Sequence, residues 1–312
     1  MIVISEDIWS PEFAALQERV AIRHEPDLWE RSDELRAALA DATALVVRNR
    51  TKVNRELIAV APKLKIIARA GVGLDNIDIN AADERGIVVS AALGINATAV
   101  AELTLGLALA LARKVMERDR QTRAGEWIRT AGTEISGKTW GILGFGATGR
   151  AVARLLQGFD TRILAFDPFV KSATGVTLTD FETIIKEAEV ISIHLPATAD
   201  TRGIIDSKVL SQMRPTTLLI NVGRGEVIDE AALESSLQEG VIAGAALDVR
   251  ATEPPKDQRF LGLSNVILTP HIAGITVESQ AAINRVLVSE IELALAGAPQ
   301  RYAVGAVKQV RA

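Results

Sequence analysis

Three residues whose side chains could transfer a proton and bind a carboxylate stand in three separate polar segments. His271 lies in Thr-Pro-His-Ile-Ala-Gly, Arg224 lies between two glycines, and Glu253 precedes two prolines. An imidazole can donate or accept a proton near neutral pH, and a planar guanidinium suits bidentate binding of a carboxylate. A carboxylate next to the imidazole would fix the orientation of the ring. The set predicts acid–base chemistry, such as carbonyl reduction, on a substrate that carries a carboxylate.

Each of these residues also has a plainer interpretation. Arg224 could be a solvated side chain in a surface turn, and Glu253 could be a charged residue in an exposed loop. Of the other two histidines, His24 lies among charged residues and is interpreted as a bystander, whereas His194 ends an apolar segment before Pro196 and could line a cofactor site. Spacing along the chain leaves open whether the three loops meet.

A glycine-rich segment, Gly144 to Gly149, follows an apolar run and precedes a helical pattern. Its G-x-G-x-x-G spacing is typical of dinucleotide-binding turns, where glycines allow a tight turn and close approach of the backbone to a pyrophosphate. The N–H groups at the helix N-terminus would bind the phosphates. Asp167 ends the next apolar run near the expected spacing of about 20 residues, where a carboxylate binds ribose hydroxyls and repels a 2′-phosphate. The segment predicts NAD rather than NADP as cofactor; the alternative is a simple tight turn.

Composition limits the class of protein. The chain has 312 residues, a net charge of −4, 48% hydrophobic and 24% charged residues, which suggests about two globular domains and no nucleic-acid or membrane partner. It has no cysteine, so disulfides, thiolate metal sites and a cysteine nucleophile are excluded. No catalytic metal is expected, because carbonyl reduction with the three residues above needs none. The most apolar stretch, Val100 to Ala112, contains Glu102 and is shorter than the roughly 20 residues that span a bilayer. Since no signal-peptide pattern is present, we expect a cytoplasmic protein.

The elements that must position these residues alternate between β-type runs and helical patterns, which predicts parallel sheets with crossover helices. One long buried helix is predicted over Ala97 to Ala124, and a last helix over Val277 to Gly297 could return to the first domain. The predicted strands form a first series at residues 2–5, 44–48, 66–69 and 87–89 and a second at 139–143, 162–166, 190–195, 218–222, 243–249 and 266–269.

These elements predict an α/β fold with two doubly wound parallel-sheet domains. A Rossmann NAD-binding domain, residues 98–286, is inserted into a flavodoxin-like substrate domain made of residues 1–97 plus 287–312. Ligands of such sheets bind at the carboxyl ends of the strands, which is where the polar segments of the second series lie.

Four further segments resemble the signatures of the D-isomer-specific 2-hydroxyacid dehydrogenases, and the similarity covers nearly the whole chain. Within the family, the chain looks most like the phosphoglycerate dehydrogenases. The resemblance implies an NAD-dependent oxidoreductase that interconverts a small 2-hydroxy acid and its 2-keto acid, with D-3-phosphoglycerate and 3-phosphohydroxypyruvate as the first expectation. Many phosphoglycerate dehydrogenases carry C-terminal regulatory domains beyond the position of Ala312, and we expect no serine feedback here. The segments are Arg69 to Asp78, Asn221 to Glu230, Gly244 to Val249 and Thr269 to Gly274.

The resemblance implies roles for individual residues. Arg224 would bind the substrate carboxylate and polarise the C2 carbonyl, His271 would be the general acid or base, and Glu253 would pair with His271. Asp248 would contact the nicotinamide amide. Residues expected at the cofactor are Gly144, Gly146, Ala147, Thr148, Gly149, Asp167, Pro168, His194, Pro196, Asn221, Val222, Asp248 and Gly274, and those expected at the substrate are Arg48, Asn49, Arg50, Lys52, Val72, Gly73 and Asn96.

A basic turn, Arg48 to Lys52, follows a predicted strand, and its cations suit a second anionic group on the substrate; the alternative is a solvated turn. The resemblance also implies a homodimer formed through the long helix after the first domain, and two domains that close over the substrate. The chain departs from the family in places: Ala147 and Thr148 stand where many members have Arg-Ile, which removes a cation near the pyrophosphate, and Arg250 stands where an aromatic residue often follows the Asp-Val pair.

Other functions stay open. A hydroxypyruvate, glyoxylate or sulfolactate-type reductase of the same family would use the same three residues. Relatives that oxidise formate or phosphite often have Gln at the position of Glu253, which argues against that reaction here. An NAD-sensing, co-repressor-like binding protein is the candidate from another class, and turnover would distinguish it from an enzyme.

Overall fold

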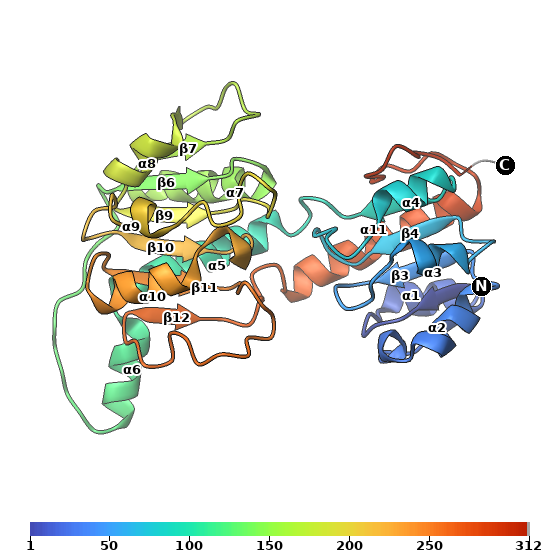
Figure 1. Cartoon of the computed structure of the whole chain (residues 1–312), viewed down its shortest axis with the longest axis horizontal. Coiled ribbons are helices and arrows are strands. Elements are labelled where there is room, and N and C mark those ends of the chain that lie inside the picture. The colour runs from blue at the N-terminus through green and yellow to red at the C-terminus, as the bar shows by residue number, and fades with distance from the viewer. Residues whose placement is uncertain (311–312) are drawn as a thin grey trace. The chain divides into compact units, whose positions relative to one another are not determined.

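A computed structural model describes residues 1–310, which form two compact units (Figure 1). The first unit contains Met1–Asn96 and the segment from Thr276 onward, and the second contains Ala97–Ile275. Each unit is built on one sheet, of five strands in the first and seven in the second, and all strand pairs in both sheets are parallel. The predicted α/β class with two parallel sheets is therefore confirmed.

The first unit alternates strands and helices along the chain. Its elements are β1 (Ile2–Ile4), α1 (Pro11–Gln17), β2 (Ile22–His24), a 3₁₀ turn (Leu28–Glu30), α2 (Ser32–Leu39), β3 (Ala44–Val47), α3 (Arg55–Ala59), β4 (Ile66–Arg69), α4 (Ile79–Glu84), β5 (Val88–Ala91) and α11 (Val277–Leu295). The strand order is β2-β1-β3-β4-β5, which is the flavodoxin-like order. Four of the five strands are buried along their whole length, as expected of a parallel sheet covered on both faces.

Helices cover both faces of the first sheet. Apolar residues of α2, α3 and α4 pack on one face, with Leu45 and Ile67. Apolar residues of α1 and α11 pack on the other, with Ile66 and Leu287 among them. The sheet is thus enclosed, and only the loops at the strand ends remain open for binding.

The second unit has the larger sheet. Its elements are α5 (Ala97–Ala112), α6 (Val115–Arg123), β6 (Thr139–Leu143), α7 (Ala147–Leu156), a 3₁₀ turn (Gln157–Phe159), β7 (Arg162–Phe166), β8 (Thr177–Leu178), α8 (Phe181–Glu187), β9 (Val190–Ile193), α9 (Ser207–Leu210), β10 (Leu218–Asn221), a 3₁₀ turn (Gly225–Val227), α10 (Glu230–Gln238), β11 (Gly244–Leu247) and β12 (Val266–Leu268). The strand order β12-β11-β10-β9-β6-β7-β8 contains the Rossmann arrangement, with the chain reversing direction across the sheet between β6 and β9.

Alternate residues of the second sheet enter two cores. Trp140 and Ile220 pack with α5 and α7, whereas Leu143 and Leu219 pack with α8, α9 and α10. In Figure 1, α5 and α7 lie on one side of the sheet and α8 and α10 on the other. Within residues 1–310, no helix combines the length and the apolar character that crossing a bilayer requires.

The predicted long helix over Ala97 to Ala124 is wrong. The structure has two helices, because Lys114 adopts a left-handed conformation with φ of 54° and separates α5 from α6. Helix α6 has no buried residue and extends away from the sheet in Figure 1. Two short strands, β2 and β8, were absent from the prediction; β2 is Ile-Arg-His and β8 has two residues, so neither has a continuous apolar run.

The second domain boundary also differs from the expected position at residue 287. Helix α11 is continuous from Val277, and Thr276 caps it through a reciprocal capping box with Ser279. Ile283 and Leu287 on this helix are buried in the first unit. The return to the first unit therefore comes at the start of α11 rather than inside it.

Candidate functional site

The three loops that carry Arg224, Glu253 and His271 follow three neighbouring strands of the second sheet. Arg224 follows β10, Glu253 follows β11 and His271 follows β12, and the strand order places β11 between the other two. Because the carboxyl ends of parallel strands meet at one edge of the sheet, these loops lie side by side.

His271 and Glu253 form a hydrogen-bonded pair. The distance from His271 Nδ1 to Glu253 Oε2 is 2.7 Å, and the two side chains are 45% and 34% exposed. The contact engages Nδ1, so Nε2 is the ring nitrogen left to exchange a proton with a bound molecule. Burial alone would raise the pKa of Glu253, but hydrogen bonds from His271 and from the backbone N–H of Arg250, with the charges of His271 and Arg224, hold it below its usual value.

The turn that carries His271 is held by a buried carboxylate. Asp248, 1% exposed, accepts hydrogen bonds from Thr269 Oγ1 (2.6 Å), Ile272 N (2.9 Å) and Ala273 N (2.8 Å). His271 itself has φ of 54°, a left-handed conformation that is costly for a residue other than glycine. A carboxylate offers about four acceptor positions, so the three hydrogen bonds that hold this turn leave one for the expected nicotinamide contact, which stays a prediction.

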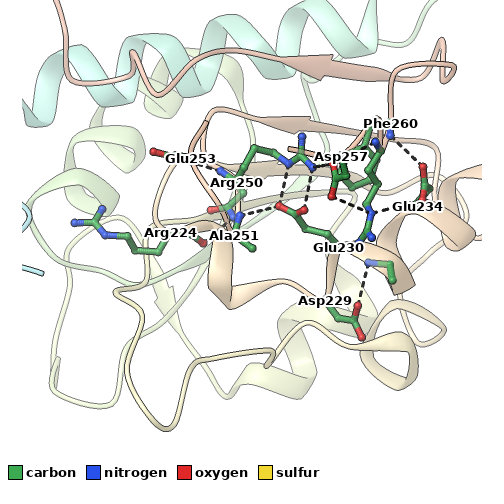
Figure 2. Close-up of polar contacts among 12 residues, drawn as sticks. Arg224, Asp229, Glu230, Glu234, Arg250, Ala251, Glu253, Asp257 and Phe260 are labelled. Carbon is green, nitrogen blue, oxygen red and sulfur yellow. Dashed lines mark hydrogen bonds and ion pairs between the residues drawn. The ribbon is translucent and has the colours of Figure 1, made fainter. Parts of the chain in front are cut away.

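Arg224 extends from a loop organised by Asn221. The Asn221 side chain is fully buried, donates to Arg224 O (2.9 Å) and accepts from Gly223 N (3.0 Å). Arg224 Nη1 donates to Gly223 O (2.9 Å). Figure 2 shows Arg224 and Glu253 extending to the same side. Asn221 thus holds the Arg224 loop from both ends of its amide, and its expected cofactor contact stays a prediction.

The glycine-rich turn between β6 and α7 has the close contacts that its sequence predicts. A Cβ at Gly149 would lie 2.2 Å from Gly144 O, whereas a Cβ at Gly146 would meet nothing within 4 Å. Gly146 is the N-cap of α7, and no side chain caps that end of the helix. The turn therefore presents backbone N–H groups beside open space, which suits a pyrophosphate.

Asp167 lies at the end of β7, next to the glycine-rich turn. Its carboxylate accepts hydrogen bonds from Phe145 N (2.9 Å) and Phe169 N (2.9 Å). These bonds fix the carboxylate and leave acceptor positions for ribose hydroxyls. Pro168 and Phe169, which follow it, are exposed.

His194 adds an unusual feature to the same region. Both ring nitrogens are buried and have no hydrogen-bond partner among the described residues, and burial lowers the pKa of His194 to about 4. A Cβ at Gly144 would lie 2.9 Å from the His194 backbone, so the histidine borders the glycine-rich turn. Orphaned polar atoms beside an open turn fit a bound group that has its own donors and acceptors. Of the other cofactor candidates, Ala147 and Pro196 are exposed, Thr148 and Gly274 are partly buried, and Val222 is buried.

The substrate candidates lie in the first unit. The backbone N–H groups of Arg48, Asn49, Arg50 and Thr51 all donate to the buried carboxylate of Glu6, over 2.8 to 3.1 Å. Burial alone would raise the pKa of Glu6, but these hydrogen bonds hold it below its usual value. The basic turn is therefore fixed by a residue far away in sequence, which no local pattern could have indicated.

The side chains of the basic turn have different surroundings. Arg48 Nη2 donates to Gln280 (2.5 Å), Arg50 lies over the Trp29 ring at 5.0 Å, and Lys52 is exposed.

A second loop joins the basic turn in the first unit. Asn76 Nδ2 donates to Arg48 O (3.1 Å) and Thr51 O (2.8 Å), which ties the loop containing Val72 and Gly73 to the turn. Asn96 ends this part of the unit and is buried. The expected substrate residues thus all lie in the first unit, whereas Arg224, Glu253 and His271 lie in the second, where His271 and Glu253 are in contact.

Comparison with known proteins finds relatives over nearly the whole chain. Residues 105–273 match the model of the D-isomer specific 2-hydroxyacid dehydrogenase NAD-binding domain. The chain is 40% identical over 305 residues to D-3-phosphoglycerate dehydrogenase of Mycobacterium leprae, covering 95% of this chain and 57% of that protein. The chain spans about half the length of most of the curated relatives it matches.

Two further relatives are covered over most of their length. The chain is 41% identical over 266 residues to hydroxypyruvate reductase of Thermotoga maritima, covering 83% of this chain and 87% of that protein. The solved structure of an NADPH-dependent glyoxylate/hydroxypyruvate reductase from Sinorhizobium meliloti, in complex with NADP and malonate, has a TM-score of 0.90 and 29% identity, covering 100% of this chain and 98% of that one. The resemblance inferred from the sequence motifs is confirmed.

The pH dependence of the free energy of unfolding should show that His194 is buried in its neutral form. In the unfolded chain this group takes up a proton near its ordinary pKa of 6.5, but in the folded protein only near 4. Between those values the unfolded state binds more protons, so the free energy of unfolding falls as the pH drops. Between pH 7 and pH 5 this histidine should contribute a loss of about 2 kcal/mol.

The measurement is urea unfolding of the wild type and His194→Leu at pH 7 and pH 5. The variant should lack that part of the pH dependence. An unchanged difference between the two pH values would show that His194 is not buried in its neutral form.

Proposed function

The chain belongs to the D-isomer-specific 2-hydroxyacid dehydrogenase family, and we propose that it is an NAD-dependent enzyme that interconverts a small 2-hydroxy acid and its 2-keto acid. The observation that carries this proposal is the His271–Glu253 contact of 2.7 Å at the same sheet edge as Arg224. Carbonyl reduction needs a proton donor and a cation for the substrate carboxylate, and this set contains both.

Each residue then has a defined part in the reaction. Arg224 binds the substrate carboxylate and polarises the C2 carbonyl through its guanidinium. His271 gives a proton from Nε2 to the carbonyl oxygen in reduction and takes it back in oxidation. Glu253 keeps the ring oriented through Nδ1 and stabilises the imidazolium. Gly144 to Gly149 and Asp167 hold NAD, which supplies or accepts the hydride when bound.

The substrate we propose is D-3-phosphoglycerate, with 3-phosphohydroxypyruvate as its keto form. The basic turn supports a second anionic group, because it has three cationic side chains on a backbone that Glu6 fixes. The name of the Mycobacterium leprae relative points the same way. Hydroxypyruvate is the second candidate, supported by the relative from Thermotoga maritima that the chain covers over most of its length.

A homodimer is part of the proposal. The segment around α6 exposes large apolar side chains, namely Val115 (46%), Met116 (50%), Trp127 (80%) and Ile128 (46%). Apolar side chains gathered on one protruding segment are typical of a protein interface, and a second copy of this chain is the partner that the family resemblance implies.

Substitution of His271 tests the acid–base assignment. His271→Ala should lower kcat by about two orders of magnitude or more, because the proton donor is lost. The affinity for NADH, measured by fluorescence titration, should stay within about twofold. Turnover equal to that of the wild type would remove His271 from the reaction.

Substitution of Asp167 tests the cofactor assignment. Asp167→Ala should weaken NADH binding about tenfold, because the ribose hydroxyls lose a charged acceptor. It should also raise kcat/KM with NADPH relative to kcat/KM with NADH, because the repulsion of the 2′-phosphate is relieved. The measurement is kcat/KM for both reduced cofactors with one keto acid. A cofactor ratio equal to that of the wild type would contradict the ribose assignment.

A substrate panel tests the basic turn. NADH oxidation is followed with 3-phosphohydroxypyruvate, hydroxypyruvate, glyoxylate, sulfopyruvate and pyruvate. The wild type should turn over the phosphorylated acid with the highest kcat/KM. The double variant Arg48→Gln, Arg50→Gln should raise KM for that acid about tenfold or more, because charged hydrogen bonds to the distal group are lost.

The non-phosphorylated acids are the internal control for this variant. Their KM values should change less than about twofold, since they have no distal charge to lose. Equal losses for all acids would assign the turn a structural role only.

A further inference from the structure

A buried ion pair contacts the backbone of the loop that carries Glu253. Arg250 Nε donates to Glu230 Oε1 (2.9 Å), and Arg250 Nη2 donates to Glu230 Oε2 (3.0 Å). The side chains are only 8% and 9% exposed. Figure 2 shows the two groups side by side, on the opposite side of the loop from the ends of Arg224 and Glu253. A bidentate pair of this kind is directional as well as strong.

Further contacts fix both members of the pair. Glu230 Oε1 also accepts from Ala251 N (2.8 Å), and Glu230 is the first residue of α10. Arg250 Nη2 also donates to Asp257 (3.1 Å), and its guanidinium lies over the Phe260 ring at 5.0 Å. The backbone at Arg250 and Ala251 is therefore anchored to a helix, which restricts where the loop can move.

The same backbone touches both reactive loops. Arg250 N donates to Glu253 Oε1 (3.0 Å), while Oε2 of that carboxylate contacts His271. On the other side, a Cβ at Gly225 would lie 1.9 Å from the Arg250 carbonyl carbon, so the loop that follows Arg224 packs directly against Arg250. The position of one backbone unit thus determines where the Glu253 carboxylate can sit.

We propose that Glu230 and Arg250 are a positioning pair for the His271–Glu253 contact. The ion pair holds the backbone of Arg250, the N–H of Arg250 holds one oxygen of Glu253, and the other oxygen then meets His271 Nδ1. The expected effect of the pair on catalysis rests on the proposed function. It goes beyond the proposed function in assigning a role to Glu230 and Arg250, which that function does not use.

The kinetic test compares three variants. Glu230→Gln removes the charge from the pair at nearly constant shape and should lower kcat about tenfold, the usual size of an effect transmitted through a supporting group. KM and the affinity for NADH should stay within about twofold, because both side chains of the pair are buried and little of either is exposed to a ligand. Arg250→Lys, which keeps the charge but loses the bidentate geometry, should recover part of kcat relative to Arg250→Met.

Arg259→Gln is the matched control. Arg259 lies in the same loop and pairs with Glu234 and Asp257 at 3.7 to 3.8 Å. Within residues 1–310 its side chain forms no hydrogen bond or ion pair with Glu230 or Glu253. Its kcat should remain within about twofold of the wild type. A loss of kcat equal to that of Glu230→Gln would mean that any substitution in this loop lowers kcat, and would overturn the proposal.

A double-mutant cycle separates positioning from general damage. If the pair acts through Glu253, then Glu230→Gln should change kcat less than about twofold once Glu253→Ala is present. The same tenfold loss in both backgrounds would overturn the proposal, because the pair would then act by another route.

The last test is an NMR measurement of the His271 imidazole, which does not depend on enzymatic turnover. The chain has three imidazoles, each with two ring nitrogens, and in ¹⁵N-histidine-labelled protein His271→Gln identifies the signals that belong to His271. The Nδ1 proton of His271 should be hydrogen-bonded in the wild type and in Arg259→Gln, and should lose that hydrogen bond in Glu230→Gln and in Glu253→Ala, which removes the acceptor. An unchanged signal in Glu230→Gln would overturn the proposal. If the signal changes as expected while the wild type reduces no keto acid, the positioning stands and the proposed function fails.

Discussion

The Asp248 carboxylate is buried at the end of β11 and accepts three hydrogen bonds from the turn that follows β12. The candidate site depends on this interaction, because that turn holds His271 in a left-handed conformation that a non-glycine residue adopts only under constraint. A relaxed turn would move the imidazole away from Glu253. The carboxylate of one strand-end loop therefore keeps the reactive ring of the next loop in place.

The same arrangement is found at all three loops of the second unit that carry the candidate site residues. Buried polar side chains hold backbone, and the held backbone presents the reactive groups: Asn221 organises the loop of Arg224, Asp248 the turn of His271, and Glu230 with Arg250 the segment before Glu253. Each of these supporting groups is at most 9% exposed. Fixed backbone costs little reorganisation during a reaction, which is the usual basis of electrostatic preorganisation.

Much of the fold could be predicted because parallel strands are continuous apolar runs, as at β6 and β7, whose bounds match the predicted ones. The glycine-rich turn was equally clear, since it combines a spacing with a strand before it and a helix after it. What could not be predicted depends on contacts that are distant in sequence. Glu6 accepts hydrogen bonds from the basic turn, which lies more than 40 residues away in sequence. No glycine or proline next to Lys114 indicates the break between α5 and α6. The sequence predicts Asp248 and Asn221 as site residues, but their contacts within the loops depend on the three-dimensional arrangement.

The buried carboxylate of Glu6 has a consequence for how substrate range can change over time. It already uses the four N–H groups of the basic turn, so any recognition of an anion there falls to side chains rather than to the main chain. Side chains can be exchanged one at a time without disturbing the scaffold beneath them. Under the proposed function, a fold arranged in this way can change its substrate preference through single substitutions in this turn, while the residues of the proposed chemistry in the other unit stay unchanged.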